Sequence, residues 1–247
     1  VTVNVEPVPI GTGLTPQDSL FGLAVKSGID PDVIMGLVSV ESGFKHCCQE
    51  GYAPKTKCNP SDDKKCPENR IINSGSSIGI MQVRYYSTNA NQQKKIQDEV
   101  NAKVRRLCGG ETIFDFDCNV KVGLDIYKDK KNSYERGCKG STEYKTSSNI
   151  RKACEICVAK DGTPYKDYQG TDAIIRAYNG WGCLASTGKD WYDEDYVGKV
   201  KKALQKIKDG KVIDDSGLKE LLSSRIGEGV MYDTIPEVVG PKPLPPG

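Results

Sequence analysis

Apolar residues recur every three to four positions over most of the chain, the spacing that lines up side chains on one face of a helix. The first two such segments, about 15–28 and 30–43, each open with a capping residue followed by proline and stop at a glycine. Further helices are predicted over about 96–107, 117–128, 147–160, 171–178, 192–208 and 218–226. No stretch alternates strongly enough to predict a sizeable sheet. The pattern therefore predicts a mainly α protein.

The composition of the segments between these helices predicts one domain with two insertions. Residues 1–13 alternate valine with polar residues before proline and glycine, so we expect an extended arm there. Residues 14–209 are expected to form one domain, since 247 residues allow a single core of roughly 150 to 200 residues plus tails. Two polar, turn-rich segments, about 45–77 and 129–170, interrupt it as predicted surface insertions. Residues 210–247 are predicted to hold the last helix and a proline-rich tail or linker.

The cysteines predict disulfide bonds and an oxidising compartment. They form an even set at positions 47, 48, 58, 66, 108, 118, 138, 154, 157 and 183, and seven of the ten lie in the two insertions. Such a set is typical of chains outside the cytoplasm, so we expect a periplasmic, cell-surface or secreted protein. Cys154 and Cys157 share a helix face and are expected to pair with distant partners. The alternatives are metal binding and free core thiols. The cysteines around His46 fit no common zinc pattern, and we expect no metal site.

Charge and hydropathy narrow the partners. Thirty-five Lys and Arg nearly cancel 33 Asp and Glu, leaving a net charge of +2, which does not favour nucleic acid as the partner. No apolar run approaches the ~18 residues that span a bilayer, and no signal peptide is present. We therefore expect that a signal or anchor has been removed, or that the chain is an excised part of a larger protein.

Glu41 is the residue whose position most suggests chemistry. It lies four residues after Leu37 and three after Val38, on the apolar face of its predicted helix and close to the helix's negative end. Both desolvation and the helix dipole disfavour ionisation, so its pKa should rise. A carboxylic acid that stays protonated near neutral pH can protonate a leaving oxygen during glycosidic cleavage. The alternative is an ordinary acidic helix end whose side chain turns to water.

Four short motifs bear on this choice. They are ESGF at 41–44, GIMQV at 79–83, NVKVGLDIY at 119–127 and AYNG at 177–180. In this order they resemble the soluble lytic transglycosylase (SLT) family, and the likeness covers about 14–209. The resemblance implies a lysozyme-like helical fold, carrying here two disulfide-rich insertions, and an enzyme that cleaves the glycan strands of bacterial peptidoglycan.

The resemblance also implies roles for particular residues. Glu41 matches the single catalytic acid and base. The expected substrate-binding residues are Ser42, Met81, Gln82, Tyr178 and Asn179. Within that set, Ser42 should orient substrate, Met81 and Gln82 should face the sugar, and the Tyr178 hydroxyl should contact the acid. Taken singly, Met81 and Tyr178 are also ordinary core residues, and Met81 more often so.

The reaction implied is a lytic transglycosylation that needs no cofactor. Glu41 would protonate the oxygen between N-acetylmuramic acid and N-acetylglucosamine and then accept the proton of the muramoyl C6 hydroxyl, which closes a 1,6-anhydro ring. Asn119, Gly123 and Tyr127 are at helical spacing and are assigned to packing. Trp181, Trp191 and Tyr192 could stack on sugars or pack in the core.

Two other functions stay open. A lysozyme-type hydrolase would need a second acid, and the first insertion offers Asp62, Asp63 and Glu68; no acid adjoins Asn73 and Ser74, which favours the transglycosylase. A non-catalytic module could instead bind peptidoglycan or dock onto an envelope-spanning secretion or conjugation assembly. In each case we expect a monomer whose partner is peptidoglycan rather than nucleic acid.

Overall fold

The computed structural model describes residues 16–44, 46, 77–87, 89–183 and 195–209. The predicted arm 1–13, the helix 218–226, the proline-rich tail and most of the first insertion lie outside these ranges. So do Trp191, Tyr192 and the acids Asp62, Asp63 and Glu68.

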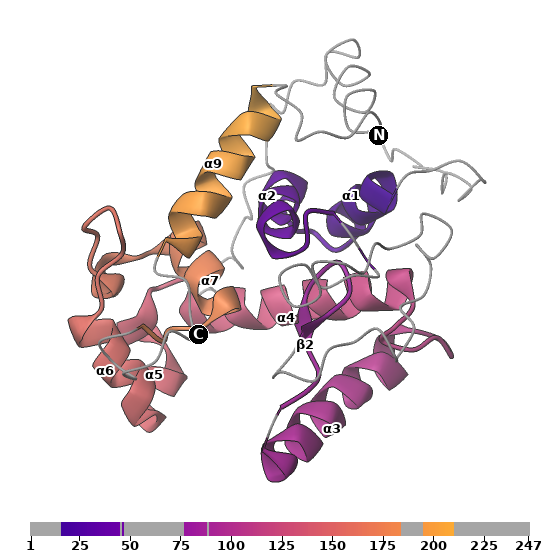
Figure 1. The fold of residues 1–247 in the computed structure, drawn as a ribbon, viewed down its shortest axis with the longest axis horizontal. Helices are drawn as coiled ribbons and strands as arrows, with labels where there is room; N and C mark the ends of the chain where they lie inside the picture. Colours follow the sequence, from indigo (N-terminus) through magenta and orange to yellow (C-terminus); the bar gives the residue numbers. More distant parts are fainter. Residues whose placement is uncertain (1–15, 45, 47–76, 88, 184–194, 210–247) are drawn as a thin grey trace, which may run out of the picture.

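The described chain is mainly helical, as the apolar pattern predicts. The α-helices are α1 (Pro16–Lys26), α2 (Pro31–Glu41), α3 (Ala90–Leu107), α4 (Phe116–Tyr134), α5 (Thr142–Thr146), α6 (Ser148–Ile156), α7 (Gly170–Asn179) and α9 (Tyr196–Lys208). Two short strands, β1 (Ser77–Ile78) and β2 (Val83–Arg84), pair antiparallel, with Ser77 opposite Arg84 and Ile78 opposite Val83. Figure 1 shows α4 crossing the middle of the molecule, with α1 on one side and α3 on the other.

Helix α2 has the start and stop that its sequence predicts. The Asp30 side chain accepts a hydrogen bond of 2.9 Å from the Asp32 N–H, and Pro31 occupies the first turn, where its missing N–H costs nothing. The helix ends at Glu41, after which the Ser42 N–H closes on the Val38 carbonyl and Gly43 takes a left-handed φ of 58°. Glu41 is thus the last residue of a helix in which all six residues from 33 to 38 are buried.

Helix α9 packs along α2 through a small residue. A Cβ added to Gly36 would lie 3.2 Å from the Val200 carbonyl oxygen and 3.3 Å from the Leu204 Cβ, so the two helices approach closely at this glycine. Val200 and Val38 are both fully buried in the core that the helices share. Figure 1 shows α9 beside α2, and a hydrogen bond between Tyr196 and Glu41 joins the start of α9 to the end of α2.

The second insertion is more ordered than its polar composition suggests. It contains the end of α4, the helices α5 and α6, and two 3-10 turns, Cys138–Gly140 and Tyr165–Asp167. Tyr134 and Tyr165 are fully buried there, and both rings pack against Trp181 at centroid distances of 5.4 and 6.2 Å. The predicted insertion thus contains the helix expected over about 147–160, and aromatic side chains give it a small core of its own that its polar composition does not reveal.

Three disulfide bonds lie within the described residues. They join Cys108 to Cys118, Cys138 to Cys154, and Cys157 to Cys183. The prediction that Cys154 and Cys157 pair with distant partners is confirmed. The four cysteines at 47, 48, 58 and 66 lie outside the described residues. The three disulfide bonds are compatible with an extracytoplasmic protein. Among the described helices, none combines the length and hydrophobicity needed to cross a bilayer.

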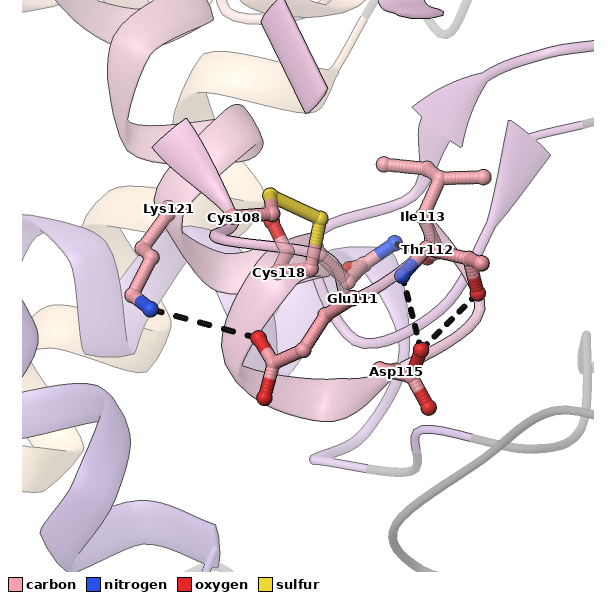
Figure 2. Close-up of a disulfide and its surroundings, with 8 residues drawn as sticks. Cys108, Glu111, Thr112, Ile113, Asp115, Cys118 and Lys121 are labelled. Atoms are coloured by element: carbon pink, nitrogen blue, oxygen red, sulfur yellow. Dashed lines mark hydrogen bonds and ion pairs between the residues drawn. A yellow bond between two sulfur atoms is a disulfide. The ribbon is translucent and has the colours of Figure 1, made fainter. Parts of the chain in front are cut away.

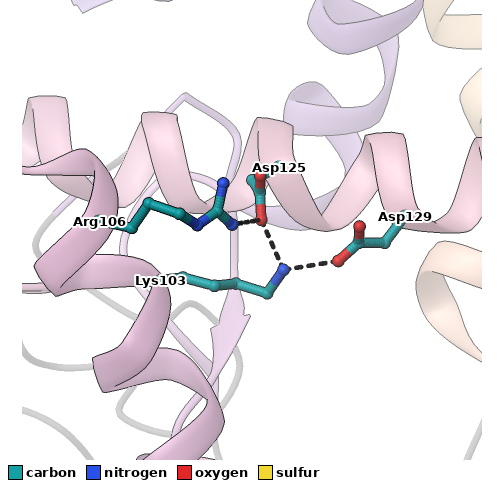
Figure 3. Close-up of polar contacts among 4 residues, drawn as sticks. All are labelled: Lys103, Arg106, Asp125 and Asp129. Atoms are coloured by element: carbon teal, nitrogen blue, oxygen red, sulfur yellow. Dashed lines mark hydrogen bonds and ion pairs between the residues drawn. The ribbon is translucent and has the colours of Figure 1, made fainter.

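Two groups of polar contacts fix α3 and α4 relative to each other. In the first, the Cys108–Cys118 disulfide closes the loop between the helices, and Asp115 accepts bonds from the Thr112 N–H and hydroxyl at 2.8 and 2.9 Å (Figure 2). In the second, Lys103 lies 2.5 Å from Asp125 and from Asp129, and Arg106 lies 2.9 Å from Asp125 (Figure 3). The first group thus closes the loop 108–118, and the second joins α3 to α4 beyond it.

Candidate functional site

Glu41 ends α2 with its carboxylate turned toward α9. Its Oε1 accepts a short hydrogen bond from the Tyr196 hydroxyl, and the side chain is partly buried. Burial raises the pKa of Glu41 to about 7, although the Tyr196 hydrogen bond and the charge of Arg176 both act to lower it. The carboxyl group can therefore be present as acid or as carboxylate at neutral pH, the property that a group acting first as acid and then as base requires.

Tyr196 is the first residue of α9 and is almost fully buried. Burial and the neighbouring Glu41 carboxylate raise the pKa of this phenol well above its ordinary value. The hydroxyl therefore keeps its proton at any pH at which Glu41 titrates, so it can donate to the Glu41 carboxylate whenever that group is ionised.

Arg176 lies behind Tyr196 in α7 and has no exposed surface. Its Nε donates to the Gly180 carbonyl at 2.8 Å, one terminal nitrogen lies 3.3 Å from the Tyr165 hydroxyl, and the other donates to Asn179 Oδ1. Buried arginines are uncommon unless they are paired, so this charge is held by a specific set of acceptors.

The GIMQV segment forms a tight turn between β1 and β2. The Gln82 N–H closes on the Gly79 carbonyl at 3.0 Å, and Gln82 itself has a left-handed φ of 47°. Gly79 is required, because its φ is 71° and an added Cβ would lie 2.3 Å from the Asn119 side-chain nitrogen. A non-glycine residue with positive φ is typical of turns whose geometry serves a site.

Two buried side chains hold this turn in place. Asn119 accepts from the Met81 N–H at 3.0 Å and donates to the Ile78 carbonyl at 3.0 Å. His46 accepts from the Ile80 N–H at Nδ1, 3.2 Å away, and its Nε2 donates to the Phe114 carbonyl at 3.0 Å. Only the neutral ring can make both bonds. Burial also favours the neutral ring, because it lowers the pKa of His46.

The same arrangement explains why the disulfide-closed loop matters to the turn. The Ile113 and Phe114 carbonyls belong to the loop 108–118, and they accept from Asn119 and His46. Both side chains then hold the turn on their other side. Asn119 is therefore a packing residue, as the sequence predicts, but one that also positions Met81.

Tyr178 reaches the turn from α7. Its hydroxyl donates to the Met81 carbonyl at 2.7 Å, across 97 residues of sequence. Burial raises the pKa of Tyr178 well above its ordinary value, and the charge of Glu41 adds to this effect. The resemblance implies that the Tyr178 hydroxyl contacts the acid; in the structure this hydroxyl donates to Met81, and the hydroxyl bonded to Glu41 is that of Tyr196.

The other predicted substrate residues are placed unequally. Met81 is fully buried, with its side chain against Gly123, so the core interpretation fits its side chain and the prediction that it faces a sugar does not. Ser42 is also buried, and its hydroxyl donates to the Val38 carbonyl at 3.2 Å. Gln82 and Asn179 are partly exposed.

The Gln82 side-chain nitrogen donates to the Gly79 carbonyl at 2.8 Å, and the Asn179 side-chain oxygen accepts from Arg176. Within the described ranges, no other hydrogen bond holds the Gln82 oxygen or the Asn179 nitrogen. Gln82 is thus the predicted substrate residue whose placement best suits a polar contact.

Sequence reasoning missed Tyr196, Arg176 and His46 as parts of the site. Tyr196 shares the apolar side of the predicted helix 192–208 with Val197, Val200 and Ile207, which indicates packing. Its hydroxyl is the one sign of a polar role, because buried tyrosines generally need a partner. Arg176 and His46 carry no signal in the sequence that separates them from surface residues. Trp181, a candidate for sugar stacking, is buried and packs in the core.

Metal binding finds no support in the part of the chain that the structure describes. No group of three or more histidine, cysteine, aspartate or glutamate side chains is close enough there to hold an ion. The two His46 ring nitrogens are used by backbone groups.

Comparison with known proteins identifies neither a family nor a related structure. No family model, no curated protein and no solved structure matches this chain.

Proposed function

We propose that this chain is a peptidoglycan lytic transglycosylase with a lysozyme-like helical domain, in which Glu41 acts as the acid and then as the base. The proposal rests on the four motifs and on one observation above the others. Glu41 is a partly buried carboxyl group with a pKa raised to about 7, and the Tyr196 hydroxyl is hydrogen-bonded to it.

The raised pKa supports the first step. At neutral pH a substantial fraction of Glu41 carries its proton, which it would give to the oxygen linking N-acetylmuramic acid to N-acetylglucosamine as that bond breaks. The N-acetylglucosamine chain leaves as an alcohol, and positive charge develops at the muramoyl anomeric carbon.

The Tyr196 donor and the Arg176 charge support the second step. Both stabilise the Glu41 carboxylate that the first step leaves behind. This carboxylate would accept the proton of the muramoyl C6 hydroxyl as its oxygen bonds to the anomeric carbon. The 1,6-anhydro ring closes and Glu41 is protonated again, so neither water nor a second carboxylate is needed.

Two partly exposed amides suit the neutral hydrogen-bonding groups of the sugars. Gln82 and Asn179 present amide groups, which match the acetamido and hydroxyl groups of the sugars. The turn that carries Gln82 is fixed by Asn119, His46 and Tyr178, so its amide can be presented with little loss of entropy on binding.

The proposal is tested by release of soluble glycan fragments from purified peptidoglycan. Glu41→Gln keeps the size of the side chain and an acceptor for Tyr196 but cannot give up a proton, so release should fall by about 10² or more. Glu99→Gln is the matched control, since Glu99 is exposed on α3 and pairs only loosely with Lys95 at 4.0 Å. Equal activity in wild type and Glu41→Gln would reject Glu41 as the acid.

A further inference from the structure

The aromatic contacts of Arg176 connect two parts of the molecule that are far apart in sequence. Its guanidinium carbon lies 5.3 Å from the centre of the Tyr165 ring and 5.6 Å from the centre of the Tyr196 ring. Both distances are within the range of a cation–π contact. Tyr165 belongs to the second insertion, whereas Tyr196 begins α9 and donates to Glu41.

The remaining contacts fix the guanidinium plane. Hydrogen bonds to Gly180, Asn179 and Tyr165 use three different nitrogens of one planar fork. A lysine could supply the charge but not the plane or the three directions of donation. The position of the Tyr196 ring is therefore set by a group that is itself held on several sides.

The Tyr165 end of this arrangement is equally constrained. Tyr165 is fully buried, its N–H donates to the Cys157 carbonyl at 2.9 Å, and its carbonyl lies beside the Cys138 sulfur. Cys157 and Cys138 are each tied by a disulfide, to Cys183 and Cys154 respectively. Two disulfide-tied cysteines of the second insertion thus hold Tyr165, which in turn contacts Arg176.

We propose that Arg176 is a positioning residue which, supported by Tyr165 of the second insertion, holds Tyr196 so that its hydroxyl stays on Glu41. The second insertion accordingly helps to position the groups around Glu41. The importance of this for catalysis rests on the proposed function, but the positioning itself does not.

The groups that face Glu41 from the packed helices are Tyr196 of α9 and Arg176 and Tyr178 of α7. Arg176 can act on Glu41 in two ways, directly by its charge or through Tyr196. Arg176→Lys separates them, because it keeps the charge and removes the planar contacts.

The test is a titration of the Glu41 carboxyl carbon by NMR in the full chain, with Glu41→Gln used to assign the signal. We expect Arg176→Lys to move the Glu41 midpoint to higher pH, since the Tyr196 hydrogen bond that lowers it is loosened. In a Tyr196→Phe background the same substitution should move the midpoint little or not at all. Lys201→Gln, which removes an exposed cation paired with Asp172 at 2.9 Å, should leave it unchanged.

An unchanged midpoint in Arg176→Lys would overturn the proposal, as would an equal shift in the Tyr196→Phe background, which would show that Arg176 acts by charge alone. If Arg176→Lys does not fold, Tyr165→Phe replaces it. This variant removes one acceptor from Arg176 while keeping the ring, and it should move the midpoint in the same direction by less. No substrate is involved, so the result holds whether or not peptidoglycan is cleaved.

Discussion

Tyr196 donates its hydroxyl proton to Glu41 across 155 residues of sequence, joining the first residue of α9 to the last residue of α2. The close approach of the two helices at Gly36 brings these ends together. Because burial opposes ionisation of Glu41 and Tyr196 favours it, the pair determines the pH range in which the carboxyl group can exchange a proton.

Removing this hydroxyl should shift the pH dependence of activity. Tyr196→Phe takes away a hydrogen bond that favours the carboxylate, so the Glu41 pKa rises above its value of about 7. Glu41 must be protonated to begin the reaction, so the alkaline limb of kcat/KM should move to higher pH, as measured by fragment release between pH 5 and 9.

Tyr144→Phe provides the control for that experiment. It removes a hydroxyl that donates to Glu155 at 2.8 Å on the surface of the second insertion, away from Glu41. Its alkaline limb should coincide with that of the wild type. A limb that stays in place or moves to lower pH in Tyr196→Phe would contradict the role given to the hydroxyl.

The raised pKa of Glu41 also predicts a loss of stability with rising pH. The folded protein binds the proton up to about pH 7, whereas the unfolded chain releases it near 4.5, so the free energy of unfolding falls as the pH rises between these values. Glu41→Gln removes the effect and should be more stable than the wild type at pH 8 by roughly 1 to 3 kcal/mol.

Urea unfolding of both proteins at pH 4.5 and 8 measures this difference. The gain from Glu41→Gln should be present at pH 8 and small at pH 4.5. The same gain at both values would mean that a cause other than ionisation is responsible. A site residue that lowers stability is expected where function requires a buried ionisable group.

His46 should give the opposite dependence on pH. Its pKa is lowered in the folded protein, so the stability that it contributes is complete above about 6.5 and is lost as the pH falls through the folded value. His46→Leu leaves the Ile80 N–H and the Phe114 carbonyl without this partner and should cost about 2 to 4 kcal/mol at pH 7.5.

A comparison of pH 7.5 with pH 5 distinguishes the titration of His46 from its packing. The difference in the free energy of unfolding between wild type and His46→Leu should be smaller at the lower pH, because the wild type then loses the contribution of the neutral ring. A gap that does not change with pH would show that His46 stabilises the turn by packing alone.

Much of the architecture could be predicted from local signals. The capping aspartate, the following proline and Gly43 bound α2 correctly, and they place Glu41 at its end. Helix α4 runs on to Tyr134, past its predicted end near 128, because the aromatic core of the second insertion continues the burial that the sequence did not reveal.

The partners of Glu41 could not be predicted in the same way. Tyr196 meets the acid only because α9 packs on α2, and Arg176 would be expected at the surface on composition alone. Long-range packing decides these contacts, whereas helix starts and stops depend on neighbours in sequence. The same reason explains the position of Tyr178. Its hydroxyl, which the resemblance places on the acid, donates to the Met81 carbonyl.

The close contact between α4 and the turn predicts a sensitive glycine. A Cβ on Gly123 would lie 2.4 Å from the Met81 Cβ, so Gly123→Ala must displace the turn or the helix and should cost about 1 to 3 kcal/mol of stability. Gly22→Ala is the matched control in α1, where nothing lies within 4 Å, and it should be neutral or stabilising by up to about 1 kcal/mol. Thermal unfolding compares the two. Equal effects would show that the contact with Met81 is not restrictive.

The most direct test of the central claim is mass spectrometry of the fragments released from purified peptidoglycan by the wild-type chain and by Glu41→Gln. We expect fragments that end in 1,6-anhydro-muramic acid from the wild type and their loss with the variant. Reducing muramic acid ends would indicate that water, and not the C6 hydroxyl, is the nucleophile. Binding to the wall without release of any fragment by the wild type would contradict the assignment of this chain as an enzyme.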